Sequence, residues 1–148
     1  MKQPRFIIAV LALTLILSAC QKSIDLPDPA LEKLFGRWDW VRSSGGFTGG
    51  TGTTASAGSS HSVEFSKNGV FSYIADGKVK DKVQFKVDVD TYYSYQKAYL
   101  ISYNSTGLFG AEQNPYPSEL VDFKGDDTLF LTEVGCADCF AHVYVRSR

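Results

Sequence analysis

Two cysteines near the end of the chain carry the clearest chemical signal. Cys136 and Cys139 are three residues apart, a spacing that a tight turn can close into a disulfide. Two reduced thiols, or a redox or metal site, are the alternatives. A redox Cys-x-x-Cys pair needs a helix N-terminus that lowers the thiolate pKa, but Phe140 to Val145 has the pattern of a strand. The disulfide is therefore the favoured interpretation.

The chain has two histidines that could act as bases or metal ligands. Neither His61 nor His142 lies beside a Gly-x-Ser-x-Gly motif, and nothing places them at ligand spacing with the cysteines. His142 alternates in phase with Tyr144 and Arg146, which is typical of a hydrogen-bonded histidine inside β-structure. His61 follows a glycine-rich segment, so we expect it to be solvated. The sequence predicts no catalytic residue, no metal and no cofactor, and hence a protein that is not an enzyme.

The N-terminus has the features of an export signal. Two basic residues precede an apolar run over residues 6–17, which is too short to span a bilayer and has the length of a signal-peptide core. The run ends in Leu-Ser-Ala-Cys at Cys20, which resembles the lipobox of bacterial lipoproteins. The resemblance implies a signal peptide over 1–19 and lipidation of the Cys20 thiol. An ordinary secretory signal that ends at Ala19 is the alternative.

Lipidation of Cys20 implies a membrane partner and a subcellular localisation. Two or three acyl chains on one residue suffice for stable membrane anchoring. Residues 20–33, with Pro27 and Pro29, are predicted to form a tether. The expected localisation is the cell envelope of a Gram-negative bacterium. Gln21 is not the aspartate associated with retention in the inner membrane, so the outer membrane is favoured.

Length and composition place the rest of the chain in one globular domain. The protein has 148 residues, of which 44% are hydrophobic and 14% aromatic, too apolar for a disordered chain. The formal net charge is -1, so no broad basic surface indicates nucleic-acid binding. One core with many aromatic side chains is expected, and no particular protein partner is predicted.

Short alternating segments predict an all-β domain. The clearest is Lys78 to Asp90, a segment with the period-two pattern of a strand with one wet face. The residues predicted to share its apolar face are Val79, Val83, Phe85, Val87 and Val89. Asn-Gly and Asp-Gly pairs mark hairpin turns. The eight predicted strands span residues 37–42, 62–66, 70–75, 78–90, 97–104, 119–123, 128–133 and 140–146. Eight consecutive antiparallel strands can close into an up-and-down β-barrel without free edges.

One segment between the first two predicted strands stands apart. Of the 18 residues from Ser43 to Ser60, all but Phe47 are Gly, Ser, Thr or Ala, and six are glycines. Such a segment buries too little apolar area to offset the entropy of ordering it. A mobile loop is the favoured prediction. A lid that carries Phe47 into a barrel mouth is the alternative.

A Gly-x-Trp motif at the start of the barrel region resembles the lipocalin signature. Gly36 and Trp38 carry it, and the surrounding sequence is similar to lipocalin-like lipoproteins of Bacteroidetes. The resemblance covers residues 34–148 and implies a lipocalin-like eight-stranded barrel. In lipocalins an arginine near the last strand packs over this tryptophan and seals one end of the barrel. Gly36, Trp38 and Arg146 are the implied sealing residues here.

The large number of aromatic residues is compatible with either a filled barrel or a barrel with a cavity. An eight-stranded barrel is just wide enough to be filled by side chains or to hold one small ligand. The lipocalin resemblance favours non-catalytic binding of a small hydrophobic or amphipathic molecule. The alternative is a structural or accessory lipoprotein with a filled barrel, acting through protein or glycan contacts; a cavity above about 300 Å³ would favour the ligand binder. The predicted ligand-binding residues are Trp40, Phe65, Phe85, Tyr99, Ile101 and Tyr103.

Overall fold

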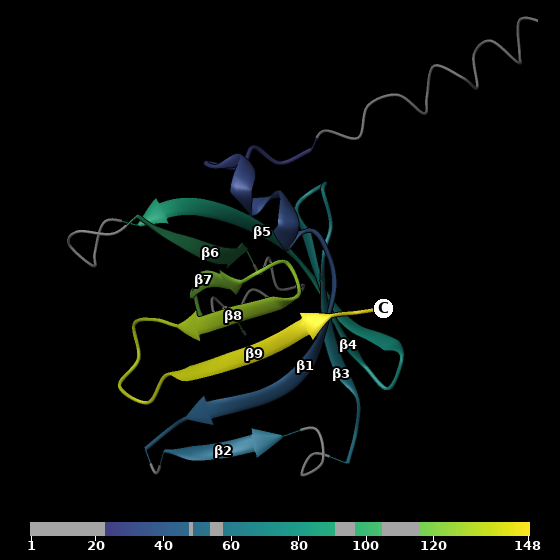
Figure 1. Ribbon diagram of the computed structural model, residues 1–148, viewed down its shortest axis with the longest axis vertical. Coiled ribbons are helices and arrows are strands. Elements are labelled where there is room, and N and C mark those ends of the chain that lie inside the picture. The colour runs from purple at the N-terminus through teal and green to yellow at the C-terminus, as the bar shows by residue number, and fades with distance from the viewer. Residues whose placement is uncertain (1–22, 48, 54–57, 91–96, 105–115) are drawn as a thin grey trace, which may run out of the picture.

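The computed structural model describes residues 23–47, 49–53, 58–90, 97–104 and 116–148. Within these residues lie one short 3-10 helix and nine strands (Figure 1). In chain order they are η1 (Pro29–Leu34), β1 (Gly36–Gly45), β2 (Gly50–Thr53), β3 (His61–Phe65), β4 (Val70–Ala75), β5 (Lys78–Asp90), β6 (Ala98–Asn104), β7 (Glu119–Lys124), β8 (Thr128–Glu133) and β9 (Phe140–Arg146). No helix in this part of the chain has the length and apolar character needed to cross a membrane.

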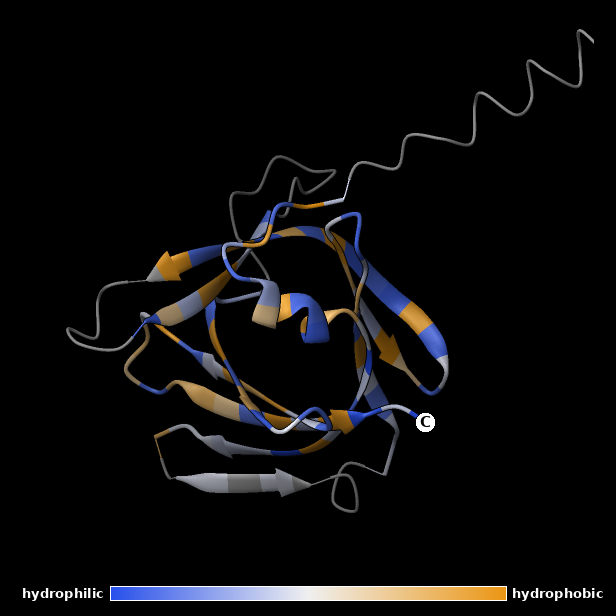
Figure 2. Cartoon of the chain, turned by 45° about the horizontal axis from the view of Figure 1, so that its top comes forward, coloured by the Kyte–Doolittle hydropathy of each residue, from blue (hydrophilic) through white to orange (hydrophobic). Residues whose placement is uncertain are grey.

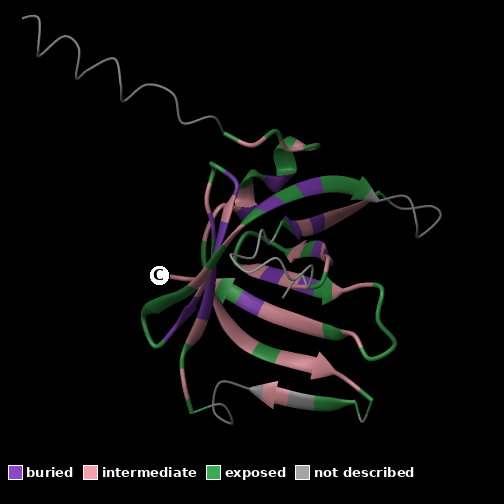
Figure 3. Ribbon diagram, turned by 180° about the vertical axis from the view of Figure 1, so that it is seen from behind, coloured by how far each residue is buried: buried purple, intermediate pink, exposed green. Residues whose placement is uncertain are grey.

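Eight of the strands form a closed antiparallel barrel, which confirms the predicted fold class. β1 pairs with β3, each later strand pairs with the next in sequence, and β9 returns to pair with β1. β2 lies outside this ring and pairs with the second half of β1. Buried positions alternate with more exposed ones along several of the strands (Figure 3), because successive side chains of a strand point to opposite faces of the barrel wall.

One end of the barrel is closed by η1, which lies across the opening (Figure 2). Leu31 and Leu34 of this helix are 1% and 0% exposed and belong to the main hydrophobic core. Asp28 caps the helix by accepting the Ala30 N–H at 2.9 Å, the arrangement that satisfies an otherwise free helix donor. We call this closed end the sealed end.

The sealing residues implied by the lipocalin resemblance lie together at this end. Trp38 is fully buried, and its Nε1–H donates to the Leu34 carbonyl at 2.8 Å. The Arg146 guanidinium stacks over the Trp38 ring at 3.8 Å and donates to the carbonyls of Phe35 (2.8 Å) and Lys33 (2.5 Å). One cation therefore joins the last strand, the first strand and the helix.

Gly36 makes this arrangement possible through its backbone. Its φ is +113°, a conformation that side chains other than glycine rarely adopt. A Cβ at this position would also lie 3.2 Å from Nη1 of Arg146. Glycine is therefore required both for the bend between η1 and β1 and for the close approach of the arginine.

The half of the barrel next to the sealed end is filled by aromatic side chains. Phe65 contacts Phe71 and Phe85, each at 5.2 Å between ring centroids. Phe71 continues the cluster to Tyr103 at 4.8 Å and to Tyr116 at 5.1 Å. Most of these contacts are tilted or edge-to-face, the geometry that aromatic pairs prefer. This half is a packed core.

The predicted mobile loop over residues 43–60 is wrong in its first part. β1 continues through Gly45, and β2 forms a hairpin with it. The extension forms because β1 pairs with β9 through backbone groups, for which side-chain volume is not needed. At Gly45 a Cβ would lie 2.3 Å from the Cys139 carbonyl oxygen, so the glycine admits this close approach. Phe47 is 92% exposed and does not reach the barrel interior; residues 48 and 54–57 lie outside the described residues.

The shared face predicted for β5 fails at both ends of the strand, and Val89 at its far end is 44% exposed. Val79 is 51% exposed, whereas Phe85 and Val87 are buried. The register with β4 shifts between Tyr73 and Ile74, which pair with Asp81 and Val79. This irregularity inserts one extra residue, and a single-residue shift reverses the face that each side chain occupies.

The predicted tether over 20–33 is described from residue 23 onward, and this part packs on the barrel. Ile24 N–H donates to the Lys67 carbonyl at 2.9 Å. Asp28 accepts hydrogen bonds from Tyr99 and from Lys97 of the barrel, and the Tyr99 bond is the main cause that lowers the pKa of Asp28. The structured domain therefore begins earlier than the predicted boundary at residue 34.

Replacement of Trp38 by alanine should lower the free energy of unfolding by ~3–5 kcal/mol, as expected for a large aromatic in a packed core. The measurement is a urea titration followed by circular dichroism. Phe47→Ala is the matched control, because this aromatic side chain is solvated, and its effect should stay within ~0.5 kcal/mol. A loss below about 1 kcal/mol for Trp38→Ala would contradict its role in the seal.

Candidate functional site

The half of the barrel away from the sealed end contains a pocket of about 250 Å³. Four strands contribute to its wall, namely β1, β3, β4 and β9. Most of the lining side chains are aromatic or imidazole rings, and none is a lysine or an arginine. The lining residues are Trp40, Ser43, His61, Ser62, Val63, Tyr73, His142 and Tyr144.

A chain of hydrogen bonds runs along the wall formed by β1 and β9. The Trp40 Nε1–H donates to Ser43 Oγ at 2.8 Å, and Ser43 Oγ lies 2.6 Å from His142 Nδ1. His142 Nε2 lies 3.4 Å from Glu133 Oε1. The network assigns the serine proton to the bond with Nδ1 and the imidazole proton to Nε2, facing the carboxylate. The chain fixes the Trp40 indole and the His142 ring in the pocket wall.

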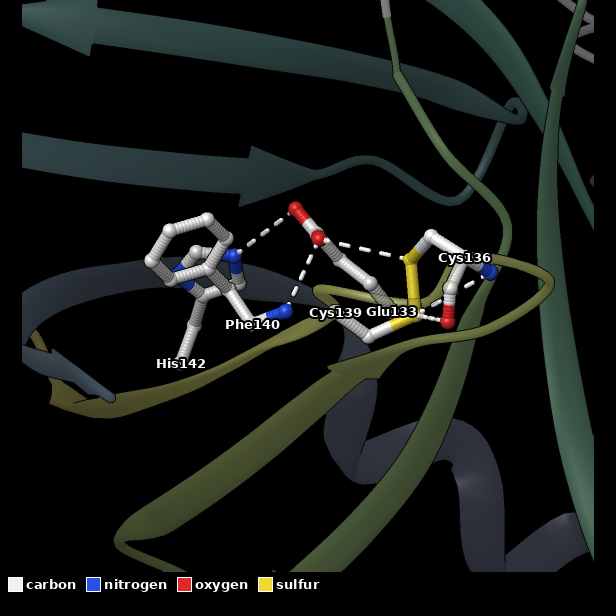
Figure 4. Close-up of a disulfide and its surroundings, with 5 residues drawn as sticks. All are labelled: Glu133, Cys136, Cys139, Phe140 and His142. Atoms are coloured by element: carbon white, nitrogen blue, oxygen red, sulfur yellow. Dashed lines mark hydrogen bonds and ion pairs between the residues drawn. A yellow bond between two sulfur atoms is a disulfide. The ribbon is translucent and has the colours of Figure 1, made fainter. Parts of the chain in front are cut away.

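The loop between β8 and β9 holds the carboxylate at the end of this chain (Figure 4). Cys136 and Cys139 form a disulfide within the loop. Glu133 Oε2 accepts the N–H of Phe140 at 2.9 Å, and the Cys136 sulfur lies 3.9 Å from the same oxygen. The cross-link closes only a short loop, so its entropic effect on stability is small. Its local effect is to fix the turn that positions Glu133 beside His142.

His61 forms the opposite wall of the pocket. Its Nδ1 lies 2.6 Å from the Tyr73 hydroxyl, and its Nε2 lies 2.7 Å from Ser59 Oγ. The imidazole is stacked with the Tyr73 ring and meets the Trp40 ring edge-on at 5.6 Å. The prediction of a solvated His61 is therefore wrong, because alternation along β3 turns this side chain inward with Val63 and Phe65.

Tyr144 presents a hydroxyl to the pocket without a hydrogen-bond partner among the described residues. The residue is only 9% exposed, and its ring contacts His142 at 6.4 Å. Burial, followed by the negative charge of Glu119, raises the pKa of Tyr144 well above its ordinary value. The group is thus a protonated phenol that can both donate and accept a hydrogen bond.

Glu119 is a buried carboxyl deeper in the barrel. The Tyr103 hydroxyl donates to its Oε2 at 2.5 Å. Burial raises the pKa of Glu119 to about 7, and the charge of Glu133 acts in the same direction, while the hydrogen bond from Tyr103 opposes them. Glu119 pairs directly with Glu133 in the β7–β8 register. Two acidic side chains therefore lie next to one another in the barrel half that contains the pocket.

The structure separates the predicted ligand-binding residues into three groups. Trp40 lines the pocket. Tyr99 lies at the sealed end, where it contacts Asp28. The other four, Phe65, Phe85, Ile101 and Tyr103, are between 0% and 5% exposed in the packed core. The alternation of each strand correctly indicates an inward face, but it does not indicate at which level of the barrel the space remains.

Most residues of the pocket wall were not among the predicted ligand-binding residues. His61, Tyr73 and Ser43 received no binding role, although Ser43 and His61 flank the glycine-rich segment. His142 and Tyr144 were placed in phase with Arg146, and that phase was a usable signal. Since Arg146 seals one end, residues two and four positions earlier on the same face must approach the other end.

Ser43, His142 and Glu133 are hydrogen-bonded in the order serine, histidine, carboxylate, as in the catalytic triads of acyl-transfer enzymes. The backbone around Ser43, however, differs from that of such an active site. Ser43 lies within β1, where it is aligned with Gly52 of β2 and with His142 of β9. The neighbouring backbone amides are committed to these ladders, so they do not form the pair of free donors that stabilises an oxyanion. Glu133 and the two cysteines also lie within 4.8 Å of one another, but the joined sulfurs are not thiolate ligands.

Comparisons with protein-family models, with curated proteins and with solved structures find no match for this chain. The resemblance to lipocalin-like lipoproteins therefore stays a prediction from the sequence motifs. Cys20 and the signal peptide lie outside the described residues.

Glu119→Gln should change how stability depends on pH. The pKa of Glu119 is raised from 4.5 in the unfolded chain to about 7 in the fold, so the folded state binds this proton more tightly. Its stabilising effect is complete below pH 4.5 and is lost as the pH rises through 7, a change of roughly 3 kcal/mol. Glutamine does not titrate, so urea titrations between pH 5 and 8 should show this decline in the wild type but not in the variant.

The exposed Glu64 supplies the control for this experiment. Glu64→Gln removes one carboxylate from the outer face of β3 and should leave the pH profile parallel to that of the wild type. Parallel profiles for Glu119→Gln and the wild type would contradict the raised pKa.

Proposed function

We propose that this protein is a lipid-anchored protein of the cell envelope that binds a small amphipathic molecule without chemical turnover. The observation that carries the proposal is the pocket beside Tyr144. The Tyr144 hydroxyl has no hydrogen-bond partner among the described residues, and since none of their fully buried side-chain oxygens lacks a partner, this hydroxyl is accessible and can bind a polar group of a ligand that enters the pocket. The rings of Trp40, Tyr73 and the two histidines would contact the apolar part of the ligand.

The cavity volume restricts the size of the ligand. At about 250 Å³ the pocket is slightly smaller than the usual range of about 300–1,000 Å³ for drug-sized ligands, and it falls just below the volume set as the criterion for a ligand binder. Filling of the other half of the barrel by Phe65, Phe85 and Tyr103 is the reason. We therefore infer that the part of the ligand held in this pocket is a single ring or a short chain. A neighbouring hollow of about 760 Å³ shares Trp40, His61 and Ser62 with the pocket and offers room for a further part of the ligand.

The proposed anchor gives the barrel an orientation. Ile24 lies four positions after Cys20, a distance of at most about 14 Å when extended. Ile24 is bound to Lys67 in the β3–β4 turn at the sealed end. A lipid on Cys20 would hold the sealed end toward the membrane, so the pocket end would face the aqueous compartment. The ligand would then arrive from water.

A second candidate function is supported by the packed half of the barrel. A protein with a largely filled interior can act as a structural or accessory lipoprotein through its surface. The exposed side chains of Phe47 (92%) and Phe140 (40%) lie near one another in the fold, since Gly46 approaches the Phe140 ring. They offer apolar area for such contacts.

The Cys20→Ala variant should not be lipidated. Growth of the native host with an alkyne-labelled fatty acid should label the wild-type protein and leave the variant unlabelled and incompletely processed. The Cys136→Ala/Cys139→Ala variant should be labelled like the wild type, because neither of these cysteines lies directly after the signal segment, where lipidation takes place. Lipid label on the Cys20→Ala protein would contradict the lipobox interpretation.

Native mass spectrometry of the protein purified from its own host should reveal a small bound molecule. Trp40→Ala removes one wall of the pocket and should lose the adduct, while the surface variant Phe47→Ala should keep it. A wild-type protein without any adduct, together with a co-purified protein partner, would instead favour the accessory function.

A further inference from the structure

We propose that the pocket selects a small organic cation, such as a primary amine that carries an apolar group, over neutral and anionic molecules of the same shape. This inference rests on the proposed function and specifies its ligand class. It depends on three independent features of the pocket: the rings that line it, the free hydroxyl of Tyr144, and the acidic side chains beside it.

The first feature is the density of aromatic faces. Trp40, Tyr73 and Tyr144 come from three different strands and converge on one volume of about 250 Å³. Ring faces carry negative electrostatic potential, and Trp and Tyr attract cations most strongly when water is excluded. Several rings around one small volume therefore favour an ammonium group over an isosteric neutral group.

The second feature is the hydrogen bonding of the wall. Both ring nitrogens of His61 and both of His142 have partners in the protein, as does the Ser43 hydroxyl. The Tyr144 hydroxyl, in contrast, lies in a residue that is nine-tenths buried and has no partner among the described residues. Its oxygen can accept a hydrogen bond from an ammonium or a hydroxyl of the ligand.

The third feature is the charge of the surroundings. Glu133 is separated from the pocket by the His142 ring alone, at 3.4 Å, and Glu119 pairs with Glu133 in the sheet. Both carboxyls are close enough to raise the pKa of Tyr144, although burial is its main cause. The sealing cation, Arg146, lies at the other end of the barrel over Trp38. One cation also lies next to the lining, because Arg37 Nε donates to Ser62 Oγ at 3.1 Å, but Arg37 is paired with Asp39 at 3.7 Å. Among the described residues the lining itself holds no lysine or arginine, so the two glutamates leave an excess of negative charge that disfavours carboxylate ligands such as fatty acids.

Three probes of nearly equal shape test the inference on the lipid-free protein that begins after Cys20. They are 2-phenylethylamine, 2-phenylethanol and phenylacetate, each titrated at pH 7.5 by isothermal calorimetry and by tryptophan fluorescence, because Trp40 lines the pocket. The amine should bind about tenfold more tightly than the alcohol, and phenylacetate should bind more weakly than either.

The outcomes separate this inference from the proposed function. Equal or tighter binding of the alcohol would overturn the selection of cations and leave a neutral-ligand pocket. Tightest binding of phenylacetate would also overturn it. Failure of all three probes to bind would contradict both the cation inference and the proposed pocket function.

Charge variants test the cause of the preference. Glu133→Gln retains an amide oxygen that can accept the Phe140 N–H but removes the charge, so amine affinity should fall about tenfold while alcohol affinity stays within twofold. Asp88→Asn removes the same charge from the exposed face of β5 and should change neither affinity. Tyr144→Phe should weaken the amine and the alcohol together. If Glu133→Gln does not fold, Glu119→Gln serves the same purpose, with an amine-specific loss expected.

Discussion

The stacking of the Arg146 guanidinium on the Trp38 ring is the interaction on which the architecture depends. It joins β9 to β1, the two strands that must meet for the sheet to become a barrel. The same guanidinium donates to the carbonyls of Phe35 and Lys33, which tie η1 across the opening. Arg146 is partly buried, so its cation–π contact contributes about 0.5–2 kcal/mol, and each charged hydrogen bond about 1.5–3 kcal/mol. One residue therefore couples closure of the sheet to closure of the barrel end.

Within the described residues, the interior changes character along the barrel axis with distance from η1, which seals one end. Next to η1 the side chains are apolar and fully enclosed, as for Leu34, Phe65 and Leu129. Further along, the inward positions are taken by His61, His142 and Tyr144, and the space between them is not filled. A hydrophobic core cannot extend to an open end, because water would contact it there. The packed half thus provides stability, and the polar half is available for recognition.

The sequence was sufficient for the barrel, and the lipocalin resemblance supplied the contact of Arg146 with Trp38, but the closing helix η1 lies mostly in the segment predicted as a tether. Alternation specified the eight barrel strands to within a few residues, except at Gly36–Gly45, and Gly36, Trp38 and Arg146 lie together. Periodicity could not specify the position of the cavity, because Ile101 and Tyr73 both face inward and only the packing of all strands decides which is covered. β2 was missed for a different reason: its glycines have no propensity for strand, and pairing with β1 imposes the conformation. The sign of the β5 irregularity in the sequence pattern is Asp81, an acidic residue on a face that is otherwise apolar.

The pocket has a consequence for how the protein must be made. Ser43 and His142 are hydrogen-bonded across 99 positions of sequence, and two of the pocket's four strands are the first and the last of the barrel. Contacts of such high sequence separation form late, because the intervening chain must first lose its conformational freedom. During synthesis, a chain that still lacks β9 has neither the seal nor the pocket. The pocket thus forms only when the final residues have been added. A chain that ends before β9 lacks the pocket, and the edges of β1 and β8 that would pair with β9 remain unpaired.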